Sequence, residues 1–134
     1  MITQTKDTLA EMTPDKALDL LKTGNRRFVE NKRELASRYQ EFFESLDIQF
    51  IHEPEHARSN YWLNAVIMPD RKTRDEFLTA TNEEGVMTRP IWKLLNKLDM
   101  YKDCQTDALI NAQWLEDRVV NIPSSVIDVG DMIK

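Results

Sequence analysis

The sequence is poor in several residue types that would point to a particular class of protein. It has one cysteine, three glycines and two histidines among 134 residues. The single thiol, Cys104, forms no internal disulfide, and no partner thiol or histidine near it suggests activation, so we expect it to be inert. No apolar run approaches the roughly 20 residues that a membrane helix needs. The start, MITQTKDTLAEM, lacks the apolar segment of a secretory signal. These absences predict a cytoplasmic protein with no membrane span.

The composition that is present predicts one compact soluble domain, or a small domain with an arm. Of the residues, 41% are hydrophobic and 31% are charged. The net charge of -5 is uneven, because residues 1–33 hold seven Lys/Arg against five Asp/Glu while the remainder holds eleven against eighteen. Phosphate contacts need clustered Lys and Arg, so the acidic remainder argues against a nucleic-acid partner.

Residues 60–92 carry the strongest local pattern. From Tyr61 to Met68, apolar residues occupy both faces of an extended segment, which predicts a central strand that Pro69 ends. Thr73 can cap a helix over residues 73–82, and Gly85 is placed to stop it. A short strand over 86–88 is expected to follow.

The rest of the chain predicts further helices around the same sheet. Thr13 and Pro14 can begin a helix over 14–30, and apolar spacing predicts others over 35–46 and 106–119. Short strands are expected at 48–51 and 120–122, a short helix or wrapped loop over 93–100, and a frayed tail after Ile127. The predicted fold is therefore α+β. A small, mainly antiparallel sheet of three or four strands is covered by the helices over 35–46, 73–82 and 106–119, with an N-terminal helical arm.

The segment His52-Glu53-Pro54-Glu55-His56 matches the letters of the zinc-protease motif H-E-x-x-H. That chemistry needs both histidines on one face of a helix, one turn apart, with the glutamate as base. Pro54 disfavours a helical conformation for the residue before it, so the two imidazoles would not share a face. We expect a solvated loop and no metal.

Two runs carry a resemblance to a known family. The run YWLNAVIMPDRKTRDEFLTATNEEGVMTRPIWKLLNKLDMY, followed by NAQWLEDRVVNIPSS, resembles the carboxyl-terminal part of the DegT/DnrJ/StrS family. Its members are pyridoxal-phosphate aminotransferases that act on nucleotide-linked keto-sugars, and the likeness is to the branch that makes aminated sugars for surface polysaccharides. It extends over about residues 34–126, which implies the C-terminal small domain of such an enzyme.

The resemblance implies a supporting role in which the small domain closes over the cofactor and lines the sugar-nucleotide cleft. Arg89 is the leading candidate for substrate binding, because its guanidinium can hold phosphate oxygens in a bidentate way. Trp92 could stack against a sugar or base, and Tyr61 and Lys93 come next. The alternative is that the two aromatics belong to a core or a domain interface and Arg89 is a surface charge.

In the family, a lysine holds the cofactor as an imine, an acidic residue pairs with its pyridinium nitrogen, and backbone or hydroxyl groups bind its phosphate. All of these lie upstream of the matched region. This chain has no lysine in such a context, so no catalytic residue and no bound cofactor are expected in it. Whether it acts as an enzyme is left open.

Residues 3–33 resemble a different family. The segment QTKDTLAEMTPDKALDLLKTGNRRFVENKR is similar to the amino-terminal arm of β-class carbonic anhydrases, in which a helix packs on a dimer partner. That family binds zinc through two cysteines and a histidine, and the sequence after Arg33 does not supply them. We therefore predict two parts, an arm over 1–33 and an aminotransferase-like domain over 34–134.

Two functions follow from these observations. One is a partial nucleotide-sugar (UDP-keto-sugar) aminotransferase, silent alone, whose partners would be a nucleotide-sugar and a complementary large domain. The other is a non-enzymatic interaction module that associates with itself through uncovered apolar surfaces.

Overall fold

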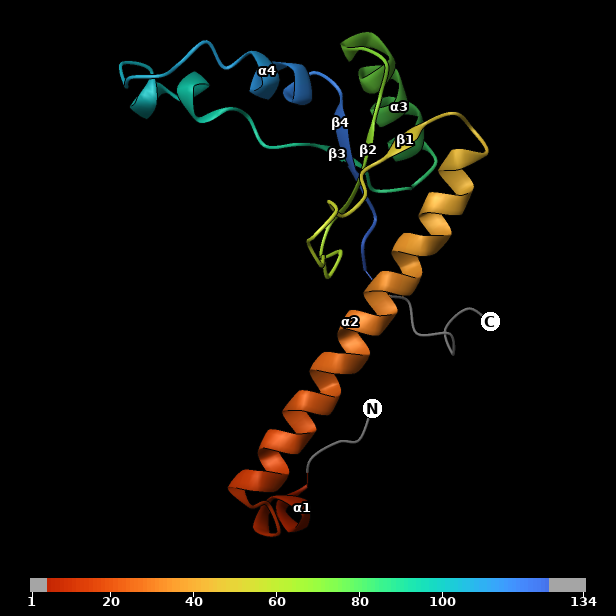
Figure 1. The fold of residues 1–134 in the computed structure, drawn as a ribbon, viewed down its shortest axis with the longest axis vertical. Helices are drawn as coiled ribbons and strands as arrows, with labels where there is room; N and C mark the ends of the chain where they lie inside the picture. Colours follow the sequence, from red (N-terminus) through yellow and green to blue (C-terminus); the bar gives the residue numbers. More distant parts are fainter. Residues whose placement is uncertain (1–4, 126–134) are drawn as a thin grey trace.

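The structure is a computed structural model that describes residues 5–125. The tail beyond Ile127, predicted to fray, lies outside these residues. The elements follow one another in the order α1 (Lys6–Ala10), α2 (Pro14–Glu44), β1 (Gln49–Phe50), β2 (Asn64–Ile67), α3 (Arg71–Glu83), β3 (Arg89–Pro90), α4 (Ile110–Glu116) and β4 (Val119–Ile122). Two 3-10 turns, η1 (Leu95–Lys97) and η2 (Asp99–Tyr101), lie between β3 and α4. In Figure 1 the sheet stands at one end of the long helix α2, and α1 lies at the other.

The four strands form one antiparallel sheet in the order β1-β2-β4-β3. The α+β fold with a small antiparallel sheet is thus confirmed, and β2 is an inner strand as predicted. The prediction that β2 begins at Tyr61 was wrong: Tyr61 has φ 48°, a left-handed conformation that cannot continue a strand, and pairing starts at Asn64.

The third strand also lies later than predicted, at Arg89–Pro90 instead of 86–88. Hydrogen bonds hold the segment before it against the end of α3. The Thr81 and Thr88 hydroxyls lie 2.6 Å apart, and the Asn82 side-chain amide donates to the Thr88 carbonyl at 3.1 Å. Thr88 is therefore hydrogen-bonded to the end of α3, and pairing with β4 begins only at the next residue, Arg89.

Helix α2 begins as the sequence predicts, with Thr13 accepting from the Lys16 amide and Pro14 in the first turn. The prediction of two separate helices was wrong, because α2 runs unbroken through residues 30–34. No glycine or proline lies between Gly24 and Pro54, so the backbone has no reason to break there. Arg38 also pairs with Glu34 at 2.6 Å, which supports the helix at this point.

One face of the sheet carries the core. Paired residues of an antiparallel sheet point to the same side, so Phe50, Val66 and Val120 share a face. Ala36 and Phe43 of α2 pack on this face, and Phe77 and Leu78 of α3 join the same cluster. Both long helices thus lie on one side of the sheet. Exposed or half-buried residues occupy most of the opposite, open face: Gln49, Ala65, Ile67, Arg89 and Asn121.

Helix α3 is capped by Asp70, whose side chain accepts from the Thr73 amide at 2.7 Å, so the prediction of Thr73 as the cap was wrong by one turn. Asp70 lies directly before the first helical residue and has the extended backbone that a cap requires. The predicted stop at Gly85 is confirmed: its φ is 79°, and the Val86 amide returns to the Thr81 carbonyl at 2.8 Å.

Helix α4 is shorter than the predicted helix over 106–119, and none of its residues is buried, so it does not cover the sheet as expected. The Asp107 side chain accepts from the Leu109 amide, and Leu109 has φ 49°. This local turn competes with the helix and delays its start to Ile110. Residues 92–109 run out from the sheet and back to it (Figure 1). None of the helices within residues 5–125 is long and apolar enough to cross a membrane.

Candidate functional site

Arg89 lies at the edge of the sheet, on strand β3. It pairs with Asn121 of β4, which pairs in turn with Ala65, so its side chain belongs to the open face. The guanidinium Nη2 lies 3.3 Å from the Met87 sulfur, and no acidic side chain pairs with it within residues 5–125. The arginine is therefore available to an anionic ligand at this edge.

Trp92 and Lys93 follow in the segment that leaves the sheet. The Ile91 amide bonds to the Val119 carbonyl at 3.4 Å, and the Leu94 amide donates to a Glu116 carboxylate oxygen at 3.0 Å. The two residues are thus held between fixed points while their side chains face solvent, and Trp92 is 75% exposed. The segment from Arg89 to Lys93 thus carries one exposed indole and two exposed cationic side chains, which are groups suited to stacking and to anion contacts.

Glu116 fixes the base of this segment. It accepts from the Leu94 amide and is ion-paired with Lys97. Burial by itself would raise the pKa of Glu116, but the hydrogen bonds from Lys97 and from the Leu94 amide outweigh it and leave the pKa below its usual value. The carboxylate stays charged at neutral pH and keeps the segment attached to α4.

The structure does not bring Tyr61 to the other three predicted residues. Its ring stacks on Phe50 of β1 at 6.3 Å, and its hydroxyl accepts from the Glu53 amide at 3.1 Å. β1 and β3 are opposite edges of the sheet, three strand spacings or about 14 Å apart. The sheet thus groups Arg89, Trp92 and Lys93 at one edge and holds Tyr61 at the other.

Around Tyr61 lies a polar cluster that the sequence analysis missed. Arg33 of α2 forms two hydrogen bonds to the Glu53 carboxylate and one to the Ser59 carbonyl, and its guanidinium lies 5.5 Å from the Tyr61 ring centroid. Glu53 also accepts from the Ser59 amide at 2.7 Å. These charge-assisted bonds lower the pKa of Glu53 to about 2. Their only sequence signal was one glutamate in a loop, 20 positions from its arginine.

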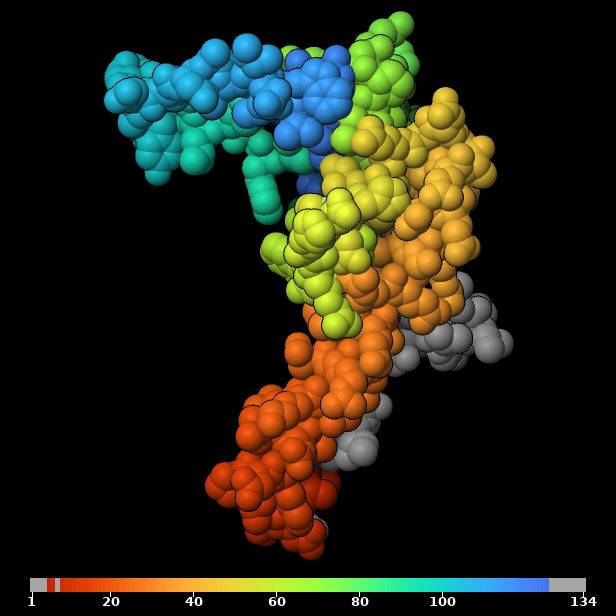
Figure 2. Space-filling model, in the orientation of Figure 1, coloured from red at the N-terminus to blue at the C-terminus, as the bar shows by residue number. Residues whose placement is uncertain are grey.

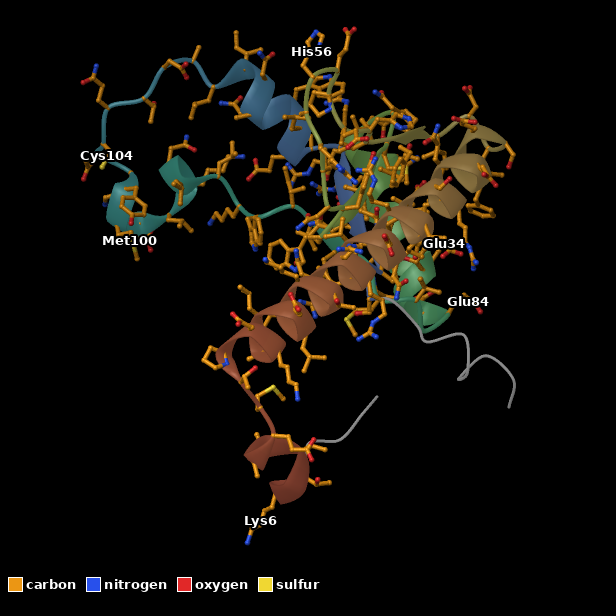
Figure 3. All side chains as sticks on the ribbon, turned by 60° about the horizontal axis from the view of Figure 1, so that its bottom comes forward. Lys6, Glu34, His56, Glu84, Met100 and Cys104 are labelled. Atoms are coloured by element: carbon orange, nitrogen blue, oxygen red, sulfur yellow. The ribbon has the colours of Figure 1, made fainter. Side chains whose placement is uncertain are left out.

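The residues of the H-E-x-x-H segment have separate structural contacts in and beside this cluster. Glu53 is bound by Arg33, and the His52 ring packs edge-on against Phe50 at 5.4 Å. His56 has φ 65° at the turn of the loop and points away from the sheet (Figure 3). Within residues 5–125, no group of three or more His, Cys, Asp or Glu side chains is placed to hold a metal ion.

A buried lysine joins α2 to the ends of two strands. Lys32 is 6% exposed, and its ammonium donates to the backbone carbonyls of Ser124 and Trp62. The Ser124 hydroxyl also accepts from the Asn64 backbone amide at 2.8 Å. Lys32 was not predicted to have a role, and its contacts assign it to holding the helix on the sheet.

Residues 92–109, which run out from the sheet and back (Figure 1), are called the projecting segment. Cys104 lies at its far end, near Met100 (Figure 3), and is exposed. No basic side chain is hydrogen-bonded to it within the described residues. Its predicted inertness stays a prediction.

Comparison with models of protein families gives a match. The family model described as the DegT/DnrJ/EryC1/StrS aminotransferase family matches residues 21–128. No curated protein matches the chain. The family match covers the sheet, α3, the projecting segment, α4 and all of α2 beyond its first two turns.

Proposed function

The chain belongs to the DegT/DnrJ/EryC1/StrS aminotransferase family, and we propose that it acts as the small-domain part of a nucleotide-sugar aminotransferase, contributing to the substrate site without performing the reaction alone. The observation that supports this proposal is that Arg89, on the edge strand β3, and Trp92 and Lys93, just after it in the chain, are exposed, and that no acidic side chain within residues 5–125 is ion-paired with either cation. A nucleotide-sugar offers the matching chemistry, since its diphosphate needs cations and its rings need a stacking surface.

The described residues do not fit a site for pyridoxal phosphate, the cofactor of the family. The buried ammonium of Lys32 is occupied by backbone carbonyls, and the exposed ammonium of Lys97 is ion-paired with Glu116. The amides at the start of α2 and α3 are capped by the chain's own Thr13 and Asp70, so neither helix offers them to a phosphate group. We infer that the cofactor is held by a large domain supplied elsewhere, and that no chemical step is carried by this chain.

Uncovered surface supports the need for such a partner. Large apolar side chains are exposed along the projecting segment and α4: Trp92, Leu95, Met100, Ile110 and Trp114. Surfaces of this kind mark places where another protein packs.

A second candidate function is a non-enzymatic module that associates through its apolar surfaces. The first half of α2 favours it, because Leu18, Leu20 and Leu21 are exposed there and the sheet does not reach them (Figure 2). The division into an arm over 1–33 and a domain over 34–134 stays a prediction. The unbroken α2 crosses the proposed boundary.

The proposal is tested by reconstitution. The full chain is first mixed with an equimolar amount of pyridoxal phosphate and treated with borohydride, and we expect no single lysine to be labelled above the level of the chain's other exposed lysines. It is then mixed with a separately produced large domain of a family member, pyridoxal phosphate and an α-amino acid as the amino donor, which leaves as its keto acid. Transamination of a UDP-keto-sugar that needs both pieces would support the proposal, and the variant Arg89→Ala should reduce it at least about tenfold, the loss of one charge-assisted contact. Two results would reject the proposal. One is transamination by the chain alone, and the other is no transamination in any mixture in which the chain is folded, with α3 and the sheet intact.

A further inference from the structure

A groove between α2 and the loop over residues 52–60 gathers cationic side chains. Five residues of α2 and one of the loop line it: Lys22, Asn25, Arg26, Val29, Glu30 and Arg58. Its volume of about 340 Å³ is at the lower end of the range of about 300–1,000 Å³ that is typical of small-molecule sites. Figure 2 shows the loop lying against α2. This set of residues is called the cationic groove below.

The three cations reach the cationic groove from two elements. Lys22 and Arg26 are one turn apart on α2, so they lie on the same side of the helix. Arg58 comes from the loop, directly before Ser59, whose carbonyl accepts from Arg33 of α2 at 2.6 Å. Because Arg33 also binds the start of this loop through a bidentate ion pair, the loop is fixed on α2 and places Arg58 at the groove. The tertiary fold therefore brings the three side chains together.

The cations of the groove have no acidic partner of their own. Lys22, Arg26 and Arg58 are exposed, and none of them is ion-paired within residues 5–125. Glu30 is the single acidic residue of the lining, and it too is outside the ion pairs of the described residues. Three cations and one carboxylate give the groove a formal charge of +2, in a chain whose net charge is -5.

The nearby carboxylate of Glu53 does not occupy Arg58. Both oxygens of Glu53 bind Arg33, and one of them also accepts from the Ser59 amide. The hydrogen bond from Arg33 is the main reason for the low pKa of Glu53, and the charge of Arg58 is the smallest of the contributions. The guanidinium donors of Arg58 are therefore left for a ligand.

We propose that the cationic groove binds a small ligand that carries a phosphate monoester. The formal charge of +2 matches the charge of about -1.5 to -2 that a phosphate monoester has at neutral pH, whereas a phosphate diester has one negative charge. The guanidinium groups of Arg26 and Arg58 can hold phosphate oxygens in a bidentate way, and the Lys22 ammonium adds a third cation. The amide of Asn25 and the apolar side chain of Val29 are available to the organic part of the ligand.

The cationic groove is separate from the proposed nucleotide-sugar site. Its loop follows β1, whereas Arg89 lies on β3 at the opposite edge of the sheet. Loss of binding at one site therefore leaves the other to be tested by itself.

An NMR titration of the full chain with methyl phosphate, at constant ionic strength, tests the site. We expect saturable shifts of the α2 amides around Arg26 and of the Arg58 guanidinium. Arg58→Ala should raise the dissociation constant at least about tenfold, because one charge-assisted contact is lost.

The matched control is Arg27→Ala. Arg27 is next to Arg26 on α2, is exposed and without an ion pair within the described residues, and lies outside the groove lining. Its removal changes the net charge as Arg58→Ala does, so the dissociation constant should change less than about twofold if contact and not long-range charge decides binding. Because both side chains are exposed, circular dichroism should show both variants folded.

Charge changes in the ligand and in the groove test the ligand class. Dimethyl phosphate carries less negative charge than methyl phosphate and should bind at least about fivefold more weakly. Glu30→Gln removes the carboxylate of the groove and should tighten binding of methyl phosphate. Glu41→Gln, an exposed position of α2 outside the lining, should not.

Three results would overturn the proposal. The first is the absence of saturable shifts with methyl phosphate. The second is an equal loss of affinity in Arg27→Ala and Arg58→Ala, which would mean that only the overall charge attracts the anion. The third is dimethyl phosphate binding as tightly as methyl phosphate, which would mean that the groove does not select a monoester.

Discussion

The Arg33 guanidinium binds both carboxylate oxygens of Glu53, with Nη1 to Oε2 at 2.8 Å and Nη2 to Oε1 at 2.7 Å. The pair ties the loop over 52–60 to α2, and the Ser59 amide and carbonyl complete it. One bidentate ion pair therefore places the loop that leads into the central strand β2.

This pair predicts a component of stability that acid removes. The pKa of Glu53 is lowered from 4.5 to about 2, so the stabilisation is complete above pH 4.5 and is lost as the pH falls toward 2. Glu53→Gln should therefore be less stable than the wild type at neutral pH, and the difference should shrink between pH 4.5 and 2. Urea unfolding across that range measures it. A difference that does not change with pH would contradict the assigned role of the carboxylate.

The two described glycines predict opposite effects of alanine. Gly85 has φ 79°, a conformation that costs other residues about 1–2 kcal/mol, so Gly85→Ala should lower the free energy of unfolding by about that amount. Gly24 lies inside α2 with nothing within 4 Å of an added Cβ. Gly24→Ala should raise the free energy of unfolding by about 0.5–1 kcal/mol. Thermal unfolding of both variants is the check, and a Gly85→Ala variant as stable as the wild type would refute the assignment of Gly85 as the helix stop.

Neighbouring phenylalanines in α2 provide a matched pair for the core. Phe43 is 5% exposed and joins α2 to the sheet, so Phe43→Ala should cost about 3–5 kcal/mol. Phe42 is 57% exposed, so Phe42→Ala should cost less than about 1 kcal/mol. Equal losses in denaturant titrations would mean that the sheet is not packed on the Phe43 side of the helix.

The sequence anticipated what depends on local chemistry. Thr13 followed by Pro14 was enough to predict the start of a helix, and Gly85 was enough to predict the end of one. The apolar residues around Val66 were enough to predict an inner strand. Prediction from the sequence failed where two local signals compete, and where contacts between residues far apart in the sequence determine the structure. Asp70 and Thr73 can both cap a helix, and the turn at Asp107 and Leu109 outweighed the apolar spacing that favoured a longer α4.

At the candidate site, sequence proximity placed Arg89, Trp92 and Lys93 together. The separation of Tyr61 from these three residues depends on the strand order β1-β2-β4-β3, which local sequence patterns do not predict. The break expected in α2 came from a change in resemblance near Arg33, and no helix-breaking residue accompanied it.

Truncation separates the arm from the residues that hold the domain. Deleting residues 1–30 should leave a chain that unfolds cooperatively, since the core begins at Ala36 and Lys32 and Arg33 remain. Deleting residues 1–33 should also leave a folded chain, but with a lower denaturation midpoint, because the contacts to Ser124 and Glu53 are lost. If the first deletion abolished cooperative unfolding, the arm would be part of the fold.

The most direct test of the central claim is an amide NMR titration of the full chain with a UDP-amino-sugar. The account predicts dispersed peaks, with selective shifts at Arg89, Lys93 and the Trp92 indole. Arg89→Ala should abolish those shifts, and Arg58→Ala, an exposed arginine on the loop near α2, should not. Dispersed peaks that do not shift when the ligand is added, or shifts that persist in Arg89→Ala, would contradict a nucleotide-sugar site at this edge of the sheet.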